Sequence, residues 1–202
     1  MSEETRKKII DLLMSTGREG MGDLVRWMNV NGFFNAPCSG GNHLAEEGGL
    51  ARHSLNVWDI MNDLYTKSVY GDVDIPGDSI IICALLHDLG KCGDYGKPGY
   101  VPNMIKSRKK DENGEYPLIQ SEAKPFEVNK ELTPIDHEIR SVKIASKFID
   151  LTEEEELAIL WHNGLYGTFK YQIQNKETPL YLLLHFADMW ASRVVEAEKQ
   201  PE

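Results

Sequence analysis

The stretch that decides the fold is Ser79-Ile80-Ile81-Ile82-Cys83-Ala84-Leu85-Leu86-His87-Asp88-Leu89-Gly90-Lys91. An unbroken apolar run, long enough for a buried helix, stops at a histidine and an aspartate that stand side by side. Charged carboxylates are almost never buried unless they are paired or bind a metal. The stretch therefore predicts a helix that crosses the core and ends at a polar site.

Three more polar residues each lie on the apolar face of a different predicted helix. Hydrophobic neighbours one or two turns away surround each of them: Leu50, Val57 and Ile60 for His53, Ala158 and Ile159 for His162, and Leu184, Ala191 and Val195 for Asp188. With His87-Asp88, four predicted helices thus direct imidazoles and carboxylates into the core. A buried carboxylate without a partner is costly, and a divalent cation shared among these groups removes that cost.

Each residue alone has a simpler explanation. A single histidine on an apolar face is more often a hydrogen-bonded core residue, and Asp188 can pair with Arg193 or His185 on its own helix. These explanations must all hold together, whereas a metal site accounts for every position at once. We therefore favour the metal site.

The order His53, His87-Asp88, Asp188 resembles the H…HD…D signature of the HD-domain metal-dependent phosphohydrolase superfamily. Two segments are similar to the H…HD…H…H…D variant of that superfamily. Asp136-His137-Glu-Ile-Arg-Ser141 resembles its GHxxxS motif, with Asp where many members have Gly, and Ile159-Leu-Trp-His162-Asn-Gly164 resembles the next histidine segment. Residues 33–54 resemble the run before the first ligand in HD-domain 3′-to-5′ exoribonucleases and related phage hydrolases. The resemblance covers nearly the whole chain and implies an all-α HD-domain helical bundle.

The resemblance also implies a centre of one or two divalent ions. Its metal ligands would be His53, His87, Asp88, His137, His162 and Asp188. If Asp88 bridges, the second ion lies at the roughly 3.5–4 Å spacing of two-metal phosphoesterases. Such ligands suit Mn, Fe, Co, Ni, Zn or Mg, so the residues predict a divalent ion without naming it. Asp88 and Lys91 are the predicted catalytic residues, since Lys91 can face a phosphate or Asp88 itself.

The chain predicts a single domain over residues 1–202, with helices at about 3–16, 20–31, 49–68, 78–90, 134–149, 153–163 and 178–198. Thr133-Pro134 and Thr178-Pro179 each predict an N-cap followed by a first-turn proline. The acidic run 153–156 is typical of a first helical turn capped by Thr152. Between about 93 and 133, glycines and prolines interrupt the helices, and Asp111-Glu-Asn-Gly114 between 101–107 and 115–121 predicts a β-hairpin insertion.

The predicted hairpin carries a run of cations that we call the basic tip: Lys106, Arg108, Lys109 and Lys110. One interpretation is a lid that contacts substrate phosphate, with Lys106 and Arg108 as substrate-binding residues. The alternative is an ordinary solvated hairpin. Arg140 and Arg193 are further candidates for phosphate contacts, and His185 for orienting Asp188. By the same resemblance His43 lies near the entrance of the site.

Composition limits the partners. The content of 41% hydrophobic and 27% charged residues is ordinary for a globular protein, and the net charge of −10 argues against extended nucleic-acid binding. No apolar run is long enough to span a membrane, and the first residues are too charged for a signal sequence, so we expect a cytoplasmic protein.

Three cysteines without paired spacing favour neither a disulfide framework nor a zinc finger. We expect Cys83 in the core and Cys92 in an exposed loop.

The sequence thus predicts a metal-dependent phosphohydrolase that cleaves a phosphate ester or anhydride of a small nucleotide-like substrate with metal-activated water. The alternatives are a 3′-to-5′ phosphodiesterase on short oligonucleotides and a non-catalytic metal-bound sensor module. The oligomeric state stays open.

Overall fold

The computed structural model describes residues 2–67, 71 and 73–197. Its central element is α4 (Gly77–Leu86), the helix of the apolar run. One side of α4 places Ile82, Leu85 and Leu86 in a hydrophobic cluster with α1 (Glu3–Ser15) and α2 (Met21–Val30). The other side places Ile80 and Cys83 in a second cluster. Because α4 is apolar all round, it is buried between two cores, and its end lies inside the molecule.

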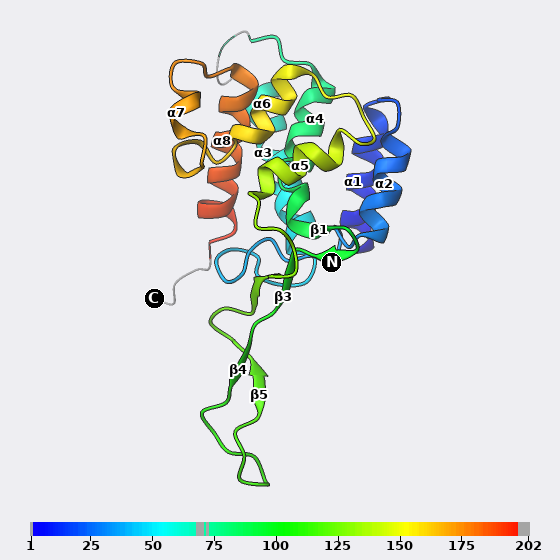
Figure 1. Ribbon diagram of the computed structural model, residues 1–202. Helices are drawn as coiled ribbons and strands as arrows, with labels where there is room; N and C mark the ends of the chain where they lie inside the picture. The colour runs from blue at the N-terminus through cyan, green and yellow to red at the C-terminus, as the bar shows by residue number, and fades with distance from the viewer. Residues whose placement is uncertain (1, 68–70, 72, 198–202) are drawn as a thin grey trace.

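The other helices surround α4, and the molecule is mostly α-helical (Figure 1). They are α3 (Gly49–Thr66), α5 (His137–Ala145), α6 (Glu153–Trp161), α7 (Lys170–Ile173) and α8 (Pro179–Trp190), with the 3₁₀ turns η1 (Leu89–Cys92) and η2 (Gly164–Tyr166) and the π-helical turn η3 (Ala191–Val195). Helix α6 begins in the predicted capping box, in which Thr152 accepts from the backbone of Glu155 and the Glu155 side chain accepts in return. Thr178 caps α8 ahead of Pro179, as predicted.

The predicted helix start at Thr133-Pro134 is wrong. Helix α5 begins at His137. The carbonyl oxygen of Thr133 accepts hydrogen bonds from the backbone N–H of Ile135 and from the guanidinium of Arg140. These bonds hold residues 133–135 as a turn, so the helix starts only after Asp136. The ends predicted at 68 and 198 fall outside the described residues.

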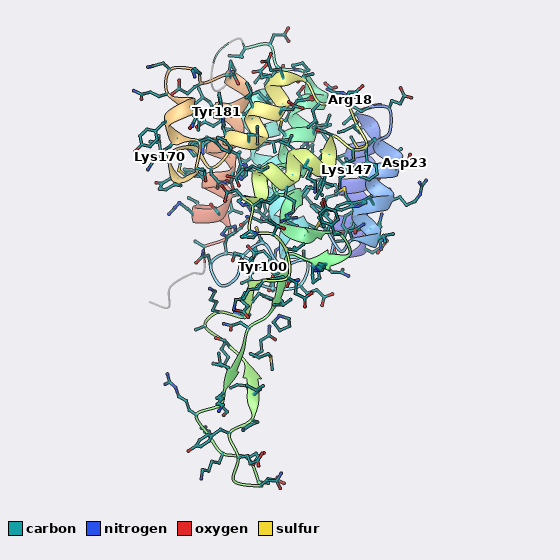
Figure 2. All side chains as sticks on the ribbon, viewed as in Figure 1. Arg18, Asp23, Tyr100, Lys147, Lys170 and Tyr181 are labelled. Atoms are coloured by element: carbon teal, nitrogen blue, oxygen red, sulfur yellow. The ribbon has the colours of Figure 1, made fainter. Side chains whose placement is uncertain are left out.

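Three two-stranded antiparallel sheets form the insertion: β1 (Gly93–Asp94) with β2 (Lys97–Pro98), β3 (Tyr100–Pro102) with β6 (Phe126–Val128), and β4 (Met104–Lys106) with β5 (Leu118–Gln120). The hairpin is confirmed. The prediction that Val101 belongs to its first strand is wrong, because Val101 pairs with Glu127 on β6. Strands β4 and β5 run along an arm that extends away from the helices (Figure 1). Tyr100 marks the place where the arm leaves the helical body (Figure 2).

The expectation that Cys92 lies in an exposed loop is wrong, because Cys92 is buried in the first core. The chain after the His-Asp pair forms η1, which packs closely on α5. The Gly90 N–H donates to Ser141 Oγ at 2.8 Å, and a Cβ at Gly90 would lie 2.2 Å from the carbonyl oxygen of His137. Glycine at position 90 therefore permits the close approach that buries Cys92. Within the described part of the chain, no helix combines the length and apolarity needed to cross a bilayer.

Candidate metal centre

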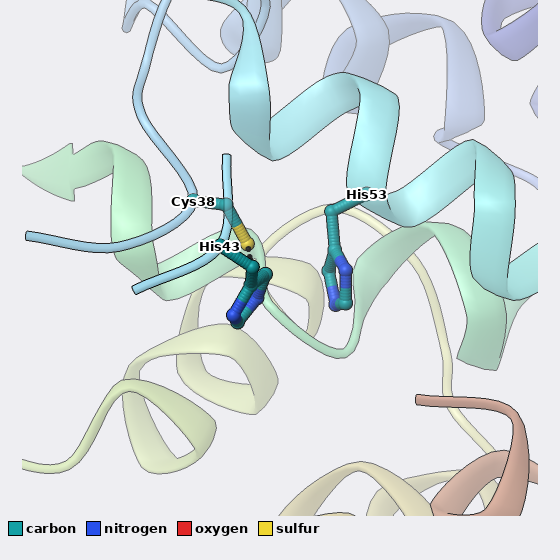
Figure 3. Close-up of side chains that lie close together, drawn as sticks. All are labelled: Cys38, His43 and His53. Atoms are coloured by element: carbon teal, nitrogen blue, oxygen red, sulfur yellow. Dashed lines mark hydrogen bonds between the residues drawn. The ribbon is translucent and has the colours of Figure 1, made fainter. Parts of the chain in front are cut away.

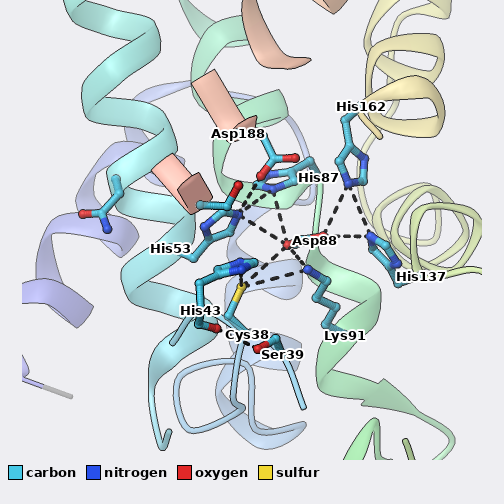
Figure 4. Close-up of polar contacts among 12 residues, drawn as sticks. Cys38, Ser39, His43, His53, His87, Asp88, Lys91, His137, His162 and Asp188 are labelled. Carbon is cyan, nitrogen blue, oxygen red and sulfur yellow. Dashed lines mark hydrogen bonds and ion pairs between the residues drawn. The ribbon is translucent and has the colours of Figure 1, made fainter. Parts of the chain in front are cut away.

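The carboxylate of Asp88 lies at the middle of a buried polar cluster, directly after α4 (Figure 4). Its Oδ2 atom lies 3.5 Å from Nε2 of His87 and 3.6 Å from Nε2 of His53, which comes from α3. These two Nε2 atoms are 3.3 Å apart. Asp188 of α8 joins them, with Oδ1 at 3.1 Å from Nε2 of His53. Three donors, from α3, the end of α4 and α8, thus converge on one side of Asp88.

The other oxygen of Asp88 faces a second pair of imidazoles. Oδ1 lies 3.0 Å from Nε2 of His137, the first residue of α5, and 3.5 Å from Nε2 of His162, at the end of α6. The two Nε2 atoms of this pair are also 3.3 Å apart. The Asp88 carboxylate therefore lies between two pairs of imidazole nitrogens, with one oxygen facing each pair.

In all four rings, Nδ1 faces an oxygen. His87 Nδ1 lies 2.9 Å from the carbonyl of Ala84, and His162 Nδ1 lies 2.7 Å from the carbonyl of Ile159. The corresponding partners are both carboxylate oxygens of Glu196, each 3.0 Å from His53 Nδ1, and Oε2 of Glu138, 3.3 Å from His137 Nδ1. An Nδ1–H that donates to oxygen leaves a neutral ring with its lone pair on Nε2. Oxygen partners of this kind orient ligand histidines in metal sites.

These contacts test whether the residues fit a metal. Two lone pairs that face each other at 3.3 Å repel unless a proton or a cation lies between them. Two nitrogens at about 2.0–2.1 Å from one ion, at the tetrahedral angle, are separated by about 3.3 Å. In addition, Asp88 Oδ1 is buried and has no hydrogen-bond partner among the described residues. Both features fit divalent cations, and the buried clusters of His and Asp can hold a metal ion.

The electrostatics of the cluster are consistent with one cation at each pair. Burial disfavours a charged imidazole, but Cys38, Asp188 and Glu196 together outweigh burial and raise the pKa of His53 well above its usual value. Burial lowers the pKa of its neighbour His87. At the other pair burial is again unfavourable, and the charge of Asp88 outweighs it and raises the pKa of His162. The groups that raise these two pKa values thus favour a positive charge at each pair.

Lys91, the second predicted catalytic residue, lies against Asp88. Its Nζ is 2.6 Å from Oδ2. Burial opposes the ammonium charge, yet Asp88 more than compensates and raises the pKa of Lys91. Burial likewise opposes the carboxylate, while Lys91 and His87 hold the pKa of Asp88 well below its usual range. Both groups therefore stay charged at neutral pH.

A cavity of about 640 Å³ opens beside the cluster at His137 and Lys91. Its other charged lining residues are Lys124, Lys130, Arg140, Glu127 and Asp136, and Tyr100 also lines it. The cavity lies between α5 and the base of the arm, so the insertion contributes to its wall through residues near β3 and β6.

The structure brings all six predicted ligands and Lys91 together, and it places the other predicted residues at different distances from them. His43 lies at the edge of the cluster, 3.8 Å from Glu196, and Arg140 lines the cavity. Arg193 is exposed and lies over the ring of Tyr166. His185 contacts the carbonyl of His162, with Nδ1 at 2.6 Å, whereas we expected it beside Asp188. The basic tip lies on the projecting arm (Figure 1) and is not brought to the cluster.

Two residues of the cluster were missed from the sequence. Glu196 follows Asp188 by eight residues, so both lie on one face of the final helical segment, and they contact the two nitrogens of His53 from either side. That i+8 spacing is a usable sequence signal. The spacing of the cysteines assigns no role to Cys38, yet Cys38 is buried with Sγ 4.0 Å from Asp88 Oδ2. Burial raises the pKa of Cys38 to about 11.

Comparison with known proteins adds no assignment: no family model matches the chain, and no curated protein or solved structure matches it significantly.

Proposed function

We propose that this protein is a metal-dependent phosphohydrolase of the HD type, acting on a small nucleotide-like phosphate. The observation that carries the proposal is the position of Asp88 between two pairs of Nε2 atoms. This is the arrangement expected of a carboxylate that bridges two ions in phosphoester hydrolysis. The resemblance of the His53, His87-Asp88, His137, His162, Asp188 order to the HD signature points the same way.

The proposed ligand sets follow from the two sides of Asp88. His53, His87 and Asp188 would hold one ion with Oδ2, and His137 and His162 would hold a second with Oδ1. Bound divalent cations would supply an activated water and neutralise charge on the phosphoryl oxygens. The Nδ1 contacts keep each ring oriented, which reduces the reorganisation that substrate binding requires.

Lys91 and the cavity would bind the substrate phosphate. Lys91 lines the cavity and contacts Asp88 through Nζ, and its raised pKa keeps it protonated, so it would supply a fixed positive charge to a phosphoryl oxygen. Lys124 and Lys130 add positive charge further along the wall. Arg140 already donates to the Thr133 carbonyl, and it thereby shapes the wall at the start of α5.

The size of the cavity favours a small substrate. About 640 Å³ lies within the range of roughly 300–1,000 Å³ that is typical of small-molecule sites. The net charge of −10 disfavours a long polyanion, since backbone binding needs clustered cations over many phosphates. A nucleoside mono- or triphosphate fits both features better than extended RNA.

The test is hydrolysis by protein that has been stripped with a chelator and reloaded with Mn²⁺. Nucleoside monophosphates, nucleoside triphosphates and a short end-labelled RNA are supplied in parallel, and released phosphate, nucleoside and RNA fragments are measured. We expect mononucleotide turnover that needs metal and disappears in Asp88→Asn. The matched control is Asp94→Asn, since Asp94 is a buried aspartate that pairs with Lys143 and Lys147.

Other outcomes would replace the proposal. A ladder of shortened RNA without mononucleotide turnover indicates a 3′-to-5′ phosphodiesterase. Bound metal without turnover of any substrate indicates a sensor module. Absence of bound metal at any concentration of Mn²⁺ would overturn the metal centre itself.

A further inference from the structure

A thiol and a fifth histidine lie at the edge of the metal centre. Cys38 is fully buried, and its Sγ lies 3.3 Å from Nε2 of His43. One donor atom each from Cys38, His43 and His53 all lie within 4.8 Å of one another. Figure 3 shows the sulfur directed at the His43 ring, with His53 beside them on α3. The proposed hydrolysis uses neither Cys38 nor His43.

The loop before α3 holds Cys38 and His43 face to face. The Cys38 N–H donates to the carbonyl of Leu44 at 3.1 Å, and Ser39 Oγ donates to the carbonyl of His43 at 2.8 Å. A Cβ at Gly49 would lie 2.1 Å from the Leu44 carbonyl oxygen, so the first residue of α3 packs directly against the loop. These contacts fix the backbone at both residues, from which the Cys38 sulfur and the His43 ring face each other.

His53 would bind an ion in this group through Nε2. Its Nδ1 is held by both oxygens of Glu196 at 3.0 Å, so Nε2 is the donor. The same Nε2 lies 3.1 Å from Asp188 and 3.3 Å from His87 Nε2. An ion held by Cys38, His43 and His53 would therefore use the ligand that the Asp188 side of the centre also needs.

We propose that Cys38, His43 and His53 form an alternative position for a thiophilic divalent ion, in competition with the Asp188 side of the centre for His53. The proposal rests on the proposed function only through this shared ligand. Thiolate and imidazole donors suit Zn²⁺ and Co²⁺, whereas Mn²⁺ and Mg²⁺ prefer oxygen-rich sets. On binding, the thiol releases its proton to solvent and the sulfur becomes a metal ligand.

Neighbouring charges support this exchange. Lys91 Nζ lies 3.9 Å from the sulfur and stabilises negative charge on it. The Glu196 carboxylate, 3.8 Å from His43 Nε2, offsets the positive charge of an ion. An ion at this position takes His53 away from the Asp188 side, so an excess of Zn²⁺ should inhibit hydrolysis by the Mn²⁺-loaded protein.

The experiment is a titration with Co²⁺ in the absence of substrate, followed by near-ultraviolet absorption. We expect a thiolate-to-cobalt charge-transfer band in the wild-type protein. The band should disappear in Cys38→Ser and in His43→Gln, and it should remain in Cys92→Ser, a buried cysteine of the first core. Mn²⁺ content, measured on every variant, shows that the Asp88 centre is still assembled. No band in the wild type, or a band that persists in Cys38→Ser, overturns the proposal.

A second measurement uses hydrolysis. Zn²⁺ should inhibit the Mn²⁺-loaded protein. Loss of a group that only orients a metal ligand typically costs about 10–100-fold in metal affinity, so loss of the ligand itself in Cys38→Ser should weaken that inhibition by on the order of tenfold or more. Equal inhibition of both proteins counts against competition for His53. The cobalt band needs no turnover, so failure of the hydrolase proposal leaves the first measurement decisive, and absence of the band leaves the hydrolase proposal intact.

Discussion

Replacement of Asp88 by Asn tests the centre most directly, because it changes charge with almost no change in shape. The carboxylate is 1% exposed and its partner Lys91 is 14% exposed. Breaking a buried ion pair costs roughly 3–5 kcal/mol, and the partial exposure of Lys91 places this pair near the lower limit. One kcal/mol shifts the melting temperature of a protein of this size by about 2–4 °C. We therefore expect chelated Asp88→Asn to melt about 6–12 °C below the chelated wild type.

The metal content of the same variant separates a metal ligand from a structural ion pair. Asp88→Asn should lose ions from both sides of the carboxylate, measured by elemental analysis after dialysis against Mn²⁺. Asp94→Asn is the matched control: Asp94 is 4% exposed and pairs with Lys143 at 2.7 Å and Lys147 at 3.4 Å. It should lose stability and keep its metal. Wild-type metal content in Asp88→Asn, or a melting temperature within about 2 °C of the wild type, would refute the reasoning.

Three further outcomes are expected. The metal-free fold gains stability from protonated His53 and His162 below the ordinary histidine pKa of 6.5, and loses it as pH rises through their raised pKa values. Mn²⁺ must displace those protons to bind, which costs about 1.4 kcal/mol for each proton and each pH unit below the raised pKa. The rise in melting temperature on adding Mn²⁺ should therefore grow from about pH 6 to pH 8. A rise that does not depend on pH contradicts this. His162→Ala should lose about one ion and keep the ion on the Asp188 side, and loss of all metal in elemental analysis would favour a single site. Replacement of Lys124 and Lys130 by alanine should raise KM for a nucleotide and leave kcat and metal content unchanged. Replacement of all four residues of the basic tip by alanine should leave KM as in the wild type. If KM rises in the basic-tip variant and not in the Lys124/Lys130 variant, the arm acts as a lid.

The α-helical core was predictable because α4 is apolar on every face. Such a helix has only one stable place, at the centre, and the surrounding helices follow from their amphipathic periodicity. The insertion was less predictable, since its strands are three residues or shorter and Pro102 ends the pairing of β3 with β6. The false start at Thr133-Pro134 has a specific cause: Arg140, seven residues further on, binds the Thr133 carbonyl. A local capping pattern contains no information about that contact.

The proposed ligands were predictable for a different reason. A polar residue on an apolar helix face requires an explanation whatever the fold, so His53, His162 and Asp188 stand out in a single sequence. Groups that orient the ligands do not stand out in this way. Two of the four Nδ1 partners are backbone carbonyls, which every residue carries, and Glu196 is marked in the sequence only by its spacing from Asp188. The cavity wall was also hidden, because Lys124 and Lys130 approach α5 only through the pairing of β3 with β6.

Backbone geometry gives an independent reason why the cluster favours cations. His87 and His162 are the C-cap residues of α4 and α6. The last carbonyls of a helix carry partial negative charge and lack intrahelical donors. Each imidazole satisfies one such carbonyl three residues earlier through Nδ1, at Ala84 and at Ile159, and turns its Nε2 toward Asp88. Two negative helix ends therefore face one buried carboxylate. This field persists when any single side chain is replaced, so variants of one histidine should retain part of their affinity for a cation, whereas removal of the Asp88 charge acts on both sides at once.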